Sequence, residues 1–140
     1  AEARPELNVL GLEIRKPLAE KNREEAVGVD NLGFISCNAN VDLSRILSGV
    51  NEFSKVERVC IQFPDPHFKM KHRKRRVVQP ALVESIAALT EPGCEVFLQS
   101  DIFGVVAEMR DIFRKNPAFE DTRKSWAVED EEEWEQWEWM

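Results

Sequence analysis

The sequence of 140 residues contains no apolar run of membrane-spanning length and only three cysteines. A membrane-spanning helix needs roughly 20 consecutive apolar residues, so we expect no membrane association. Cys37, Cys60 and Cys94 lack metal-ligand spacing, and each lies in or beside an apolar run. We therefore expect buried free thiols and an intracellular, reducing compartment, with nucleus, cytoplasm and organelle left open.

Acidic charge is concentrated at the carboxyl end. The formal net charge is −7, but residues 126–140 contain seven acids, no Lys or Arg, and all four tryptophans. Without this tail, 19 acidic residues face 19 basic ones, so basic clusters elsewhere are local patches on a neutral body. We expect one globular domain over residues 1–120 and a flexible acidic, Trp-rich tail over residues 121–140. A docking face in this tail, and folding back onto a basic patch, both remain open.

Short apolar runs alternate four times with amphipathic segments. Strands are expected at residues 8–14, 34–37, 56–63 and 95–99; helices are expected at residues 17–27, after a cap at Asn40 or Asp42, from Pro80 to a stop at Pro92, and at residues 105–113. This alternation predicts an α/β fold with a mostly parallel sheet and helices on both faces. Ligands of such sheets bind where the strands end, which directs attention to residues 13–15, 38–39, 63–76 and 100–101.

An acidic turn follows the third expected strand. Pro64 and Pro66 cannot donate to a sheet ladder, so the strand ends there and Asp65 is held in few orientations. An isolated Asp-Pro is most often an ordinary surface turn. Here a strip of cations follows it, interleaved with aromatic and histidine residues: Lys69, Lys71, Arg73, Lys74, Arg75 and Arg76. A fixed carboxylate beside such a strip suits a nucleobase edge next to phosphates.

Two alternatives for this strip are a solvated surface and a nuclear-import signal. A metal site is not expected, because no Cys or acid at ligand spacing accompanies His67 and His72. The position of residues 71–76 directly after Asp65 favours contacts with RNA phosphates.

Residues 62–76 closely resemble the signature of the tRNA (guanine-N7-)-methyltransferases, here Phe-Pro-Asp-Pro-His-Phe-Lys followed by a His/Lys/Arg cluster. The resemblance covers roughly residues 7–120. It implies a Rossmann-like class I fold and methyl transfer from S-adenosylmethionine to N7 of a guanosine in tRNA. It further implies that Asp65 is the active-site residue, that Lys69 contacts substrate, and that Lys71, Arg73, Lys74, Arg75 and Arg76 face tRNA phosphates.

The same resemblance implies a cofactor site at other strand ends. The run 10–15 looks like the family's second-strand motif, which directs Glu13, Ile14 and Arg15 to S-adenosylmethionine; Asn38, Ala39 and Gln62 are expected to face the same cofactor. Asp101 stands where the family has a substrate-contacting Thr-Asp pair, with Ser100 in place of Thr. From chemistry alone, Glu13 could equally be an exposed acid and the pair at 38–39 a helix-entry turn.

Two features of the family are not found in these residues: the glycine-rich loop that follows the first strand, and a Thr-x-x-Glu substrate element near the carboxyl end. We therefore expect an incomplete methyltransferase domain that lacks its central strand. A non-catalytic RNA-binding or partner-binding remnant is the main alternative, and another nucleotide-dependent enzyme on this fold is a third. The need for a non-catalytic partner subunit is left open.

Overall fold

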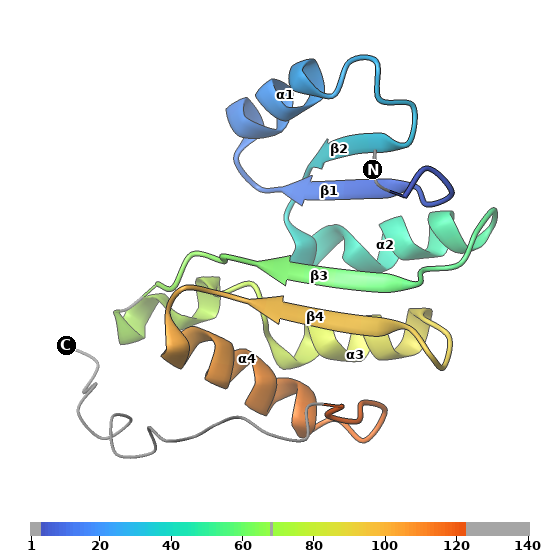
Figure 1. Cartoon of the computed structure of the whole chain (residues 1–140). Coiled ribbons are helices and arrows are strands. Elements are labelled where there is room, and N and C mark those ends of the chain that lie inside the picture. Colours follow the sequence, from blue (N-terminus) through green and yellow to red (C-terminus); the bar gives the residue numbers. More distant parts are fainter. Residues whose placement is uncertain (1–3, 68, 123–140) are drawn as a thin grey trace. The chain divides into compact units, whose positions relative to one another are not determined.

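The structure is a computed structural model, and it describes residues 4–67 and 69–122. Figure 1 shows the elements in chain order: β1 (Val9–Glu13), α1 (Lys16–Glu25), β2 (Leu32–Ser36), α2 (Ala39–Asn51), β3 (Arg58–Gln62), η1 (Met70–Arg75), α3 (Pro80–Leu89), β4 (Glu95–Gln99) and α4 (Phe103–Arg114). The predicted order of strands and helices is confirmed, with the short 3₁₀ helix η1 in addition. The Trp-rich tail predicted at the carboxyl end lies outside the described residues from 123 onward.

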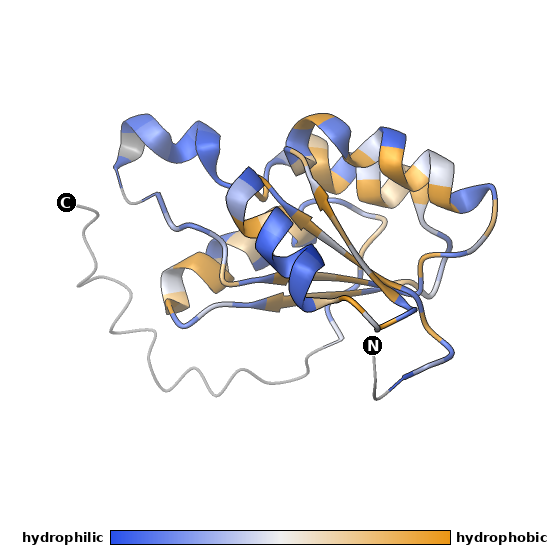
Figure 2. Cartoon of the chain, turned by 90° about the horizontal axis from the view of Figure 1, so that it is seen from above, coloured by the Kyte–Doolittle hydropathy of each residue, from blue (hydrophilic) through white to orange (hydrophobic). Residues whose placement is uncertain are grey.

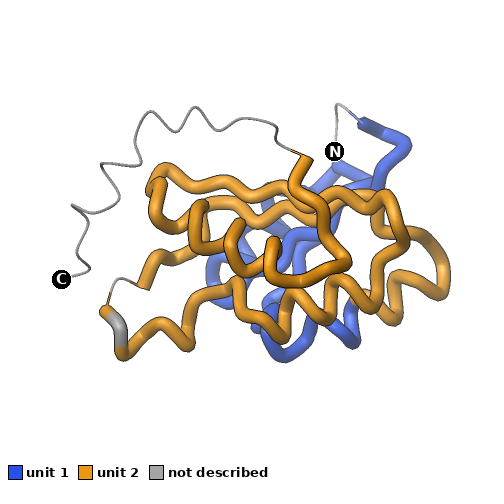
Figure 3. The backbone as a smooth tube through the Cα atoms, turned by 90° about the horizontal axis from the view of Figure 1, so that it is seen from below, with its two compact units in different colours: residues 1–46 blue, residues 47–140 orange. Residues whose placement is uncertain are grey.

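The chain divides into two compact units, residues 1–46 and residues 47–140, with the boundary inside α2 (Figure 3). Each unit contains one two-stranded sheet, β1 with β2 in the first and β3 with β4 in the second. Both pairs are parallel. The α/β fold with parallel strands, predicted from the alternation of elements, is therefore confirmed.

In the first unit, a glycine lies beneath an aromatic ring. Gly11 of β1 is the register partner of Phe34 of β2. A Cβ atom added at Gly11 would lie 2.3 Å from Cδ1 of Phe34, so the ring occupies the space of the missing side chain. The glycine in the first expected strand thus has a packing reason, because it lets the ring approach the backbone of the neighbouring strand.

Helix α1 begins next to Pro17, in the first turn, where the missing proline N–H has no intrahelical partner to lose. The chain leaves this helix through Gly28, whose φ of 90° is readily adopted only by glycine. Arg23 of α1 donates from Nε to the carbonyl of Phe34, 2.7 Å away. This bond ties the helix to β2.

The cap of α2 differs from the prediction. Asn38, and not Asn40 or Asp42, precedes the helix, and its Oδ1 accepts the N–H of Asn40 at 3.1 Å. Asp42 accepts the N–H of Asn38 through Oδ2 at 3.2 Å. The Asn38 side chain thus satisfies the N–H of Asn40, and the Asp42 side chain satisfies the N–H of Asn38, so two backbone donors of the first turn find side-chain acceptors.

In the second unit, one face of the sheet is more buried than the other. Along β3, Val59 and Ile61 are half-buried, whereas Arg58, Cys60 and Gln62 are exposed. Figure 2 shows hydrophobic residues concentrated along the strands. The buried apolar side chains of this unit beyond its boundary helix are Val78, Leu82, Val83, Ile86, Val105, Met109 and Phe113. They come from α3, α4 and the segment before α3.

The expectation of buried thiols is wrong. Cys60 is exposed, and Cys37 and Cys94 are only half-buried, although all three are free. Partial burial still raises the pKa of the Cys37 and Cys94 thiols above the usual value. Successive side chains of a strand point to opposite faces of the sheet, and Cys60 lies on the exposed face of β3. Within the described ranges, no helix is both long and apolar enough to cross a membrane.

The contact between Gly11 and Phe34 predicts a stability difference. Gly11→Ala should lower the free energy of unfolding by about 1–3 kcal/mol, because the ring must leave its place or the strands must separate. Urea unfolding followed by circular dichroism measures this value. Gly49→Ala in α2 is the control: a Cβ there meets nothing within 4 Å, and the free energy of unfolding should rise by roughly 0.5–1 kcal/mol. Equal stability of Gly11→Ala and the parent chain would show that the ring does not rest on Gly11.

Candidate functional site

In the second unit, the carboxyl ends of β3 and β4 bring three predicted site residues, Gln62, Asp65 and Asp101, to one edge of the sheet. Gln62 and Gln99 are register partners, and their side chains bond from Nε2 to Oε1 at 2.8 Å. The ladder continues with the N–H of Phe63 donating to the carbonyl of Gln99 at 2.8 Å. Asp65 and Asp101 follow these ends directly in the chain, as predicted for ligand-binding residues of a parallel sheet.

Asp65 is fixed by its own turn. Its Oδ1 accepts the N–H of His67 at 3.1 Å, which closes an Asx-turn, and Nδ1 of His67 lies 3.7 Å from the same oxygen. The side chain of Asp65 is 73% exposed. The two prolines and this turn therefore present a carboxylate to solvent with its backbone held on both sides.

The backbone around Asp65 has an unusual conformation. Phe63 has a φ of 48° and His67 a φ of 44°, and they are the positive-φ residues other than glycine in the described part of the chain. An L-residue in this left-handed region is strained by about 1–2 kcal/mol relative to its usual conformations. Such strain persists only where surrounding contacts enforce it, and it is commonest at functional sites.

Asp101 has a comparable local environment. Ser100 accepts the N–H of Ile102 at 3.1 Å and donates from Oγ to Oδ1 of Asp101 at 3.4 Å. The hydroxyl of Ser100 thus bonds both the neighbouring carboxylate and the backbone N–H of Ile102, the residue that precedes α4. Asp101 itself is exposed.

The basic strip is mostly a solvent-facing cluster. Lys69 precedes η1 and is exposed, and within η1 the exposed cations are Lys71, Arg73, Lys74 and Arg75. In a 3₁₀ helix, side chains three residues apart eclipse each other, so Lys71 and Lys74 share one face. We call these five residues the exposed basic cluster. Five cations on a short segment create a strong local positive field, although residues 1–125 are neutral in total.

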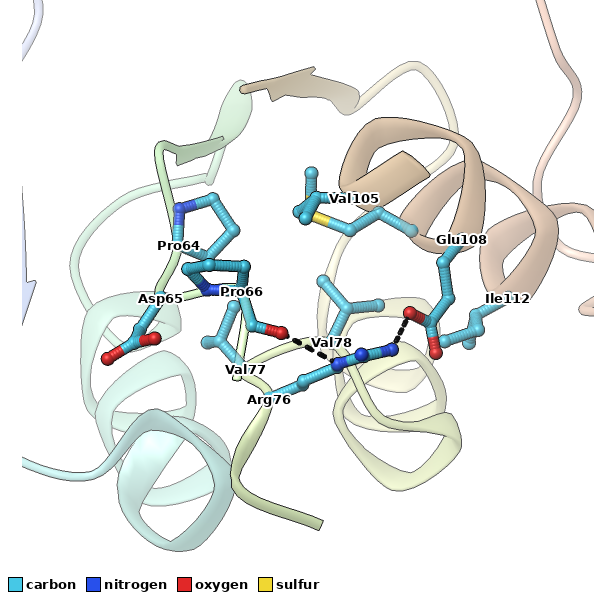
Figure 4. A pocket seen from close by; sticks show the side chains of 10 residues that line it. Pro64, Asp65, Pro66, Arg76, Val77, Val78, Val105, Glu108 and Ile112 are labelled. Atoms are coloured by element: carbon cyan, nitrogen blue, oxygen red, sulfur yellow. Dashed lines mark hydrogen bonds and ion pairs between the residues drawn. The ribbon is translucent and has the colours of Figure 1, made fainter. Parts of the chain in front are cut away.

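Arg76 does not share this exposure. It is 8% exposed, and its guanidinium donates from Nε to the carbonyl of Pro66 at 2.9 Å and from Nη2 to that of His67 at 3.4 Å. Its Nη1 bonds Oε2 of Glu108 on α4 (Figure 4). Arg73 reaches the other oxygen of Glu108 from Nε at 3.1 Å. Glu108, with a side chain 19% exposed, therefore forms ion pairs with two arginines.

Sequence reasoning did not identify Glu108 as a site residue. It lies one helical turn from Val105 and one from Ile112 on α4, both of which belong to the apolar stripe of that helix. An acid on the stripe that faces the core needs a partner, because burying an unpaired charge is unfavourable. That pattern, read with the arginines at 73 and 76, was the available signal.

A small cavity lies beneath the Asp65 turn. It has a volume of ≈ 10 Å³ and is lined by residues 64–66 of the turn, by residues 76–78, and by Glu108 and apolar side chains of α4. That volume holds one water at most, so the ring of a nucleobase cannot enter the cavity. In Figure 4 the carboxylate of Asp65 points away from this cavity and from the Arg76 guanidinium. The carboxylate therefore lies on the exposed side of the turn.

The first unit holds the other predicted residues at its own strand ends. The N–H of Cys37 donates to the carbonyl of Glu13 at 3.0 Å, so Glu13 and Asn38 follow neighbouring strand ends. Oε1 of Glu13 accepts the N–H of Arg15 at 2.8 Å and lies 3.5 Å from Nε of Arg15. Ile14 is 66% exposed. Ala39 is the first residue of α2.

The predicted residues thus form two groups. Glu13, Ile14, Arg15, Asn38 and Ala39 belong to the first unit, whereas Gln62, Asp65, Lys69, Asp101 and the cations at 71–76 belong to the second. Each group lies at the carboxyl ends of a parallel strand pair. Among residues 4–67 and 69–122, no group of three or more His, Cys, Asp or Glu side chains is arranged to hold a metal ion.

Comparisons with known proteins bear on this arrangement. A family model described as a putative methyltransferase matches residues 1–137. A curated tRNA (guanine-N(7)-)-methyltransferase of Synechococcus elongatus is 47% identical over 131 residues, which are 92% of this chain and 61% of that protein. Proteins of the same name from Trichormus variabilis and a Nostoc species are each 50% identical over 121 residues, 85% of this chain and 56% and 55% of theirs.

The chain spans between half and two thirds of the length of these curated relatives. The family model covers nearly all of its residues, including both strand pairs and the Asp65 turn. The chain therefore belongs to this methyltransferase family, and the resemblance of residues 62–76 to the tRNA (guanine-N7-)-methyltransferases is confirmed.

Proposed function

We propose that this chain acts in the transfer of a methyl group from S-adenosylmethionine to N7 of a guanosine in tRNA. The observation that carries the proposal is the Asp65 turn: a fixed, exposed carboxylate at a strand end, followed directly by the exposed basic cluster. Membership of a methyltransferase family supports the reaction class. The names of the curated relatives support the choice of base and nucleic acid.

The proposed reaction requires little acid-base catalysis by the protein. N7 of guanine already carries an exposed lone pair, so no strong base is needed to activate it. S-adenosylmethionine, when bound, supplies an activated methyl group on a sulfonium centre. The protein must align the guanine and stabilise the positive charge that develops on its ring. An exposed carboxylate held in one orientation is suited to both tasks.

Asp65 is proposed to accept N–H groups from the Watson–Crick edge of guanine. Its anionic charge then also favours the cationic ring that methylation produces. Lys69 and Asp101 are proposed substrate contacts. Asp101 emerges at the same sheet edge as Asp65, and Lys69 follows the turn in the chain.

The first unit offers residues that fit part of the cofactor. Glu13 presents a carboxylate at the end of β1, where an acid can accept from both ribose hydroxyls of a nucleotide-like ligand. Ile14 and Ala39 present apolar groups suited to an adenine ring, and Asn38 and Arg15 add polar ones. Gln62, at the end of β3, is separately proposed as a polar contact to S-adenosylmethionine. Residues 1–120 would then supply a part of the methyltransferase domain.

The exposed basic cluster is proposed to bind tRNA phosphates. Its cations are solvent-facing and adjacent to the proposed guanine contact, so they would position the RNA without reading its sequence. We also propose an intracellular, reducing location, which agrees with a tRNA substrate and with three free thiols.

The proposed role of Asp65 predicts that its substitution lowers the rate of methyl transfer but not the affinity for tRNA. Asp65→Asn should lower the rate of methyl transfer about 100-fold or more, because a preorganised charge at the reacting base is lost. The dissociation constant for tRNA should change by less than about threefold, since phosphate contacts dominate affinity. Methyl transfer from labelled S-adenosylmethionine and filter binding of unmodified tRNA measure the two quantities.

Asp111→Asn is the matched control for this prediction. Asp111 is an exposed acid on α4 that pairs with Lys115, so the same change there should leave both quantities at the parent values. The assay should use this chain and also a chimera that adds the portion of the Synechococcus elongatus relative not matched by it. Equal loss of rate and affinity in Asp65→Asn would contradict the catalytic role.

The basic cluster predicts a change in salt dependence. Each phosphate contact contributes about 0.7–0.9 to the slope of log K against log salt. The triple variant Lys71→Gln, Lys74→Gln, Arg75→Gln should therefore bind tRNA with a slope shallower by about 2–3. The control variant Lys16→Gln, Lys21→Gln, Lys115→Gln removes three exposed cations elsewhere. If both triple variants change the slope equally, the cluster is not the phosphate site.

A further inference from the structure

The buried arginine at the end of the basic strip has contacts unlike those of its neighbours. Arg75 is exposed, whereas the guanidinium of Arg76 reaches two backbone carbonyls and one carboxylate. The carbonyls belong to Pro66 and His67, the residues that directly follow Asp65. The carboxylate belongs to Glu108, so one side chain joins the Asp65 turn to α4.

We propose that Arg76 is a positioning residue for Asp65, and that its guanidinium fastens the Asp65 turn to α4 instead of contacting tRNA phosphate. The inference rests on the proposed function, since it assigns Asp65 to the guanine. It replaces the expectation that Arg76 belongs with the phosphate-contacting cations.

The path from Arg76 to Asp65 consists of three hydrogen bonds and two residues of backbone. Arg76 holds the carbonyl oxygens of Pro66 and His67 at 2.9 and 3.4 Å, and the N–H of His67 donates to Oδ1 of Asp65 at 3.1 Å. His67 has a φ of 44°, a conformation that needs outside support. Arg76 supplies that support, so the orientation of the Asp65 carboxylate depends on it.

Arginine is suited to this position for a geometric reason. Its planar guanidinium presents five N–H donors in a fixed fork, so it can serve two carbonyls and a carboxylate at once. Glu108 in turn is held by Arg73 from the other oxygen, which keeps the carboxylate oriented toward the turn. A lysine at 76 retains the charge but concentrates its donors on one atom. The contact set is therefore specific to the guanidinium.

Burial argues against a phosphate role. Arg76 is 8% exposed and lies on the cavity side of the turn, opposite to the side on which the Asp65 carboxylate points (Figure 4). A phosphate could reach the guanidinium only after the turn had left α4. The exposed cations at 71, 74 and 75 need no such rearrangement.

The test compares Arg76→Gln and Arg76→Lys with Arg75→Gln, which removes the adjacent exposed charge. In methyl transfer, Arg76→Gln should lower kcat about 10- to 100-fold through a misplaced Asp65, with KM for tRNA and the salt slope unchanged. Arg76→Lys should lie between Arg76→Gln and the parent. Arg75→Gln should show the reverse, a shallower salt slope and a raised KM with kcat maintained.

A second measurement follows the turn directly and needs no activity. Solvent exchange of the His67 backbone N–H, observed by NMR, should accelerate several-fold in Arg76→Gln and remain at the parent rate in Arg75→Gln. Arg76→Lys, the less disruptive change, should accelerate it less, and it keeps the test valid if Arg76→Gln does not fold. The charge reversal Arg76→Glu with Glu108→Arg restores an ion pair but places an acceptor instead of a donor at position 76, so exchange of the His67 N–H should remain faster than in the parent.

The outcomes are distinguishable. A shallower salt slope in Arg76→Gln, equal to that of Arg75→Gln, would overturn the proposal and return Arg76 to the phosphate contacts. Unchanged His67 exchange in folded Arg76→Lys and Arg76→Gln would also overturn it. If the parent protein transfers no methyl group while Arg76 variants still loosen the turn, the proposed function fails and the attachment of the turn by Arg76 stands.

Discussion

The prolines on either side of Asp65 impose the constraint on which the site depends. Neither proline can donate to the ladder, so the pairing of β3 with β4 ends at the Phe63 N–H. The chain must then turn, and it does so through two strained residues, Phe63 and His67. Asp65 is exposed because the turn directs its carboxylate away from α4 and from the Arg76 guanidinium (Figure 4). Its orientation is set by backbone, and not by packing of its own side chain.

The same turn shows how one segment can serve two purposes. Residues 69–75 place exposed cations on a short helix, whereas Arg76, the next residue, lies among apolar side chains and bonds Glu108. The change from exposed to buried coincides with the end of η1. Gln79 donates from Nε2 to the carbonyls of Arg73 and Arg76, which secures this end before α3 begins. Solvent-exposed charges and a buried, paired charge are thus separated along one basic run.

Most of the fold could be predicted because local signals agreed. Strand and helix types followed from apolar periodicity, and their limits followed from Pro17, Gly28, Pro64 and Pro80. Hydrogen-bonded ladders of parallel strands followed from the alternation of elements. The same reasoning placed Asp65 and Asp101 at strand ends, and the register of β3 with β4 agrees with that placement.

The differences between the predicted and the observed structure have a common physical cause. Contacts between residues far apart in the sequence cannot be read from a short segment. A basic run looks uniform, yet Arg76 is buried because an acid 32 residues away faces it. Cys60 sits in an apolar strand but on the exposed face. Asn38 caps α2 by accepting the N–H of Asn40, and Asp42 supports it from inside the helix by accepting the N–H of Asn38. The 3₁₀ helix η1 has too few residues to show a periodic pattern.

The central claim is that the Asp65 turn and its basic cluster serve methylation of guanosine N7 in tRNA. The direct measurement is transfer of labelled methyl from S-adenosylmethionine to unmodified tRNA, followed by nuclease digestion and identification of the modified nucleoside. It should be made on this chain and on the chimera that adds the remaining portion of the Synechococcus elongatus relative. The account predicts label in 7-methylguanosine at a defined tRNA position, and its loss in Asp65→Asn. Binding of tRNA with steep salt dependence, but no 7-methylguanosine from either protein, would contradict it.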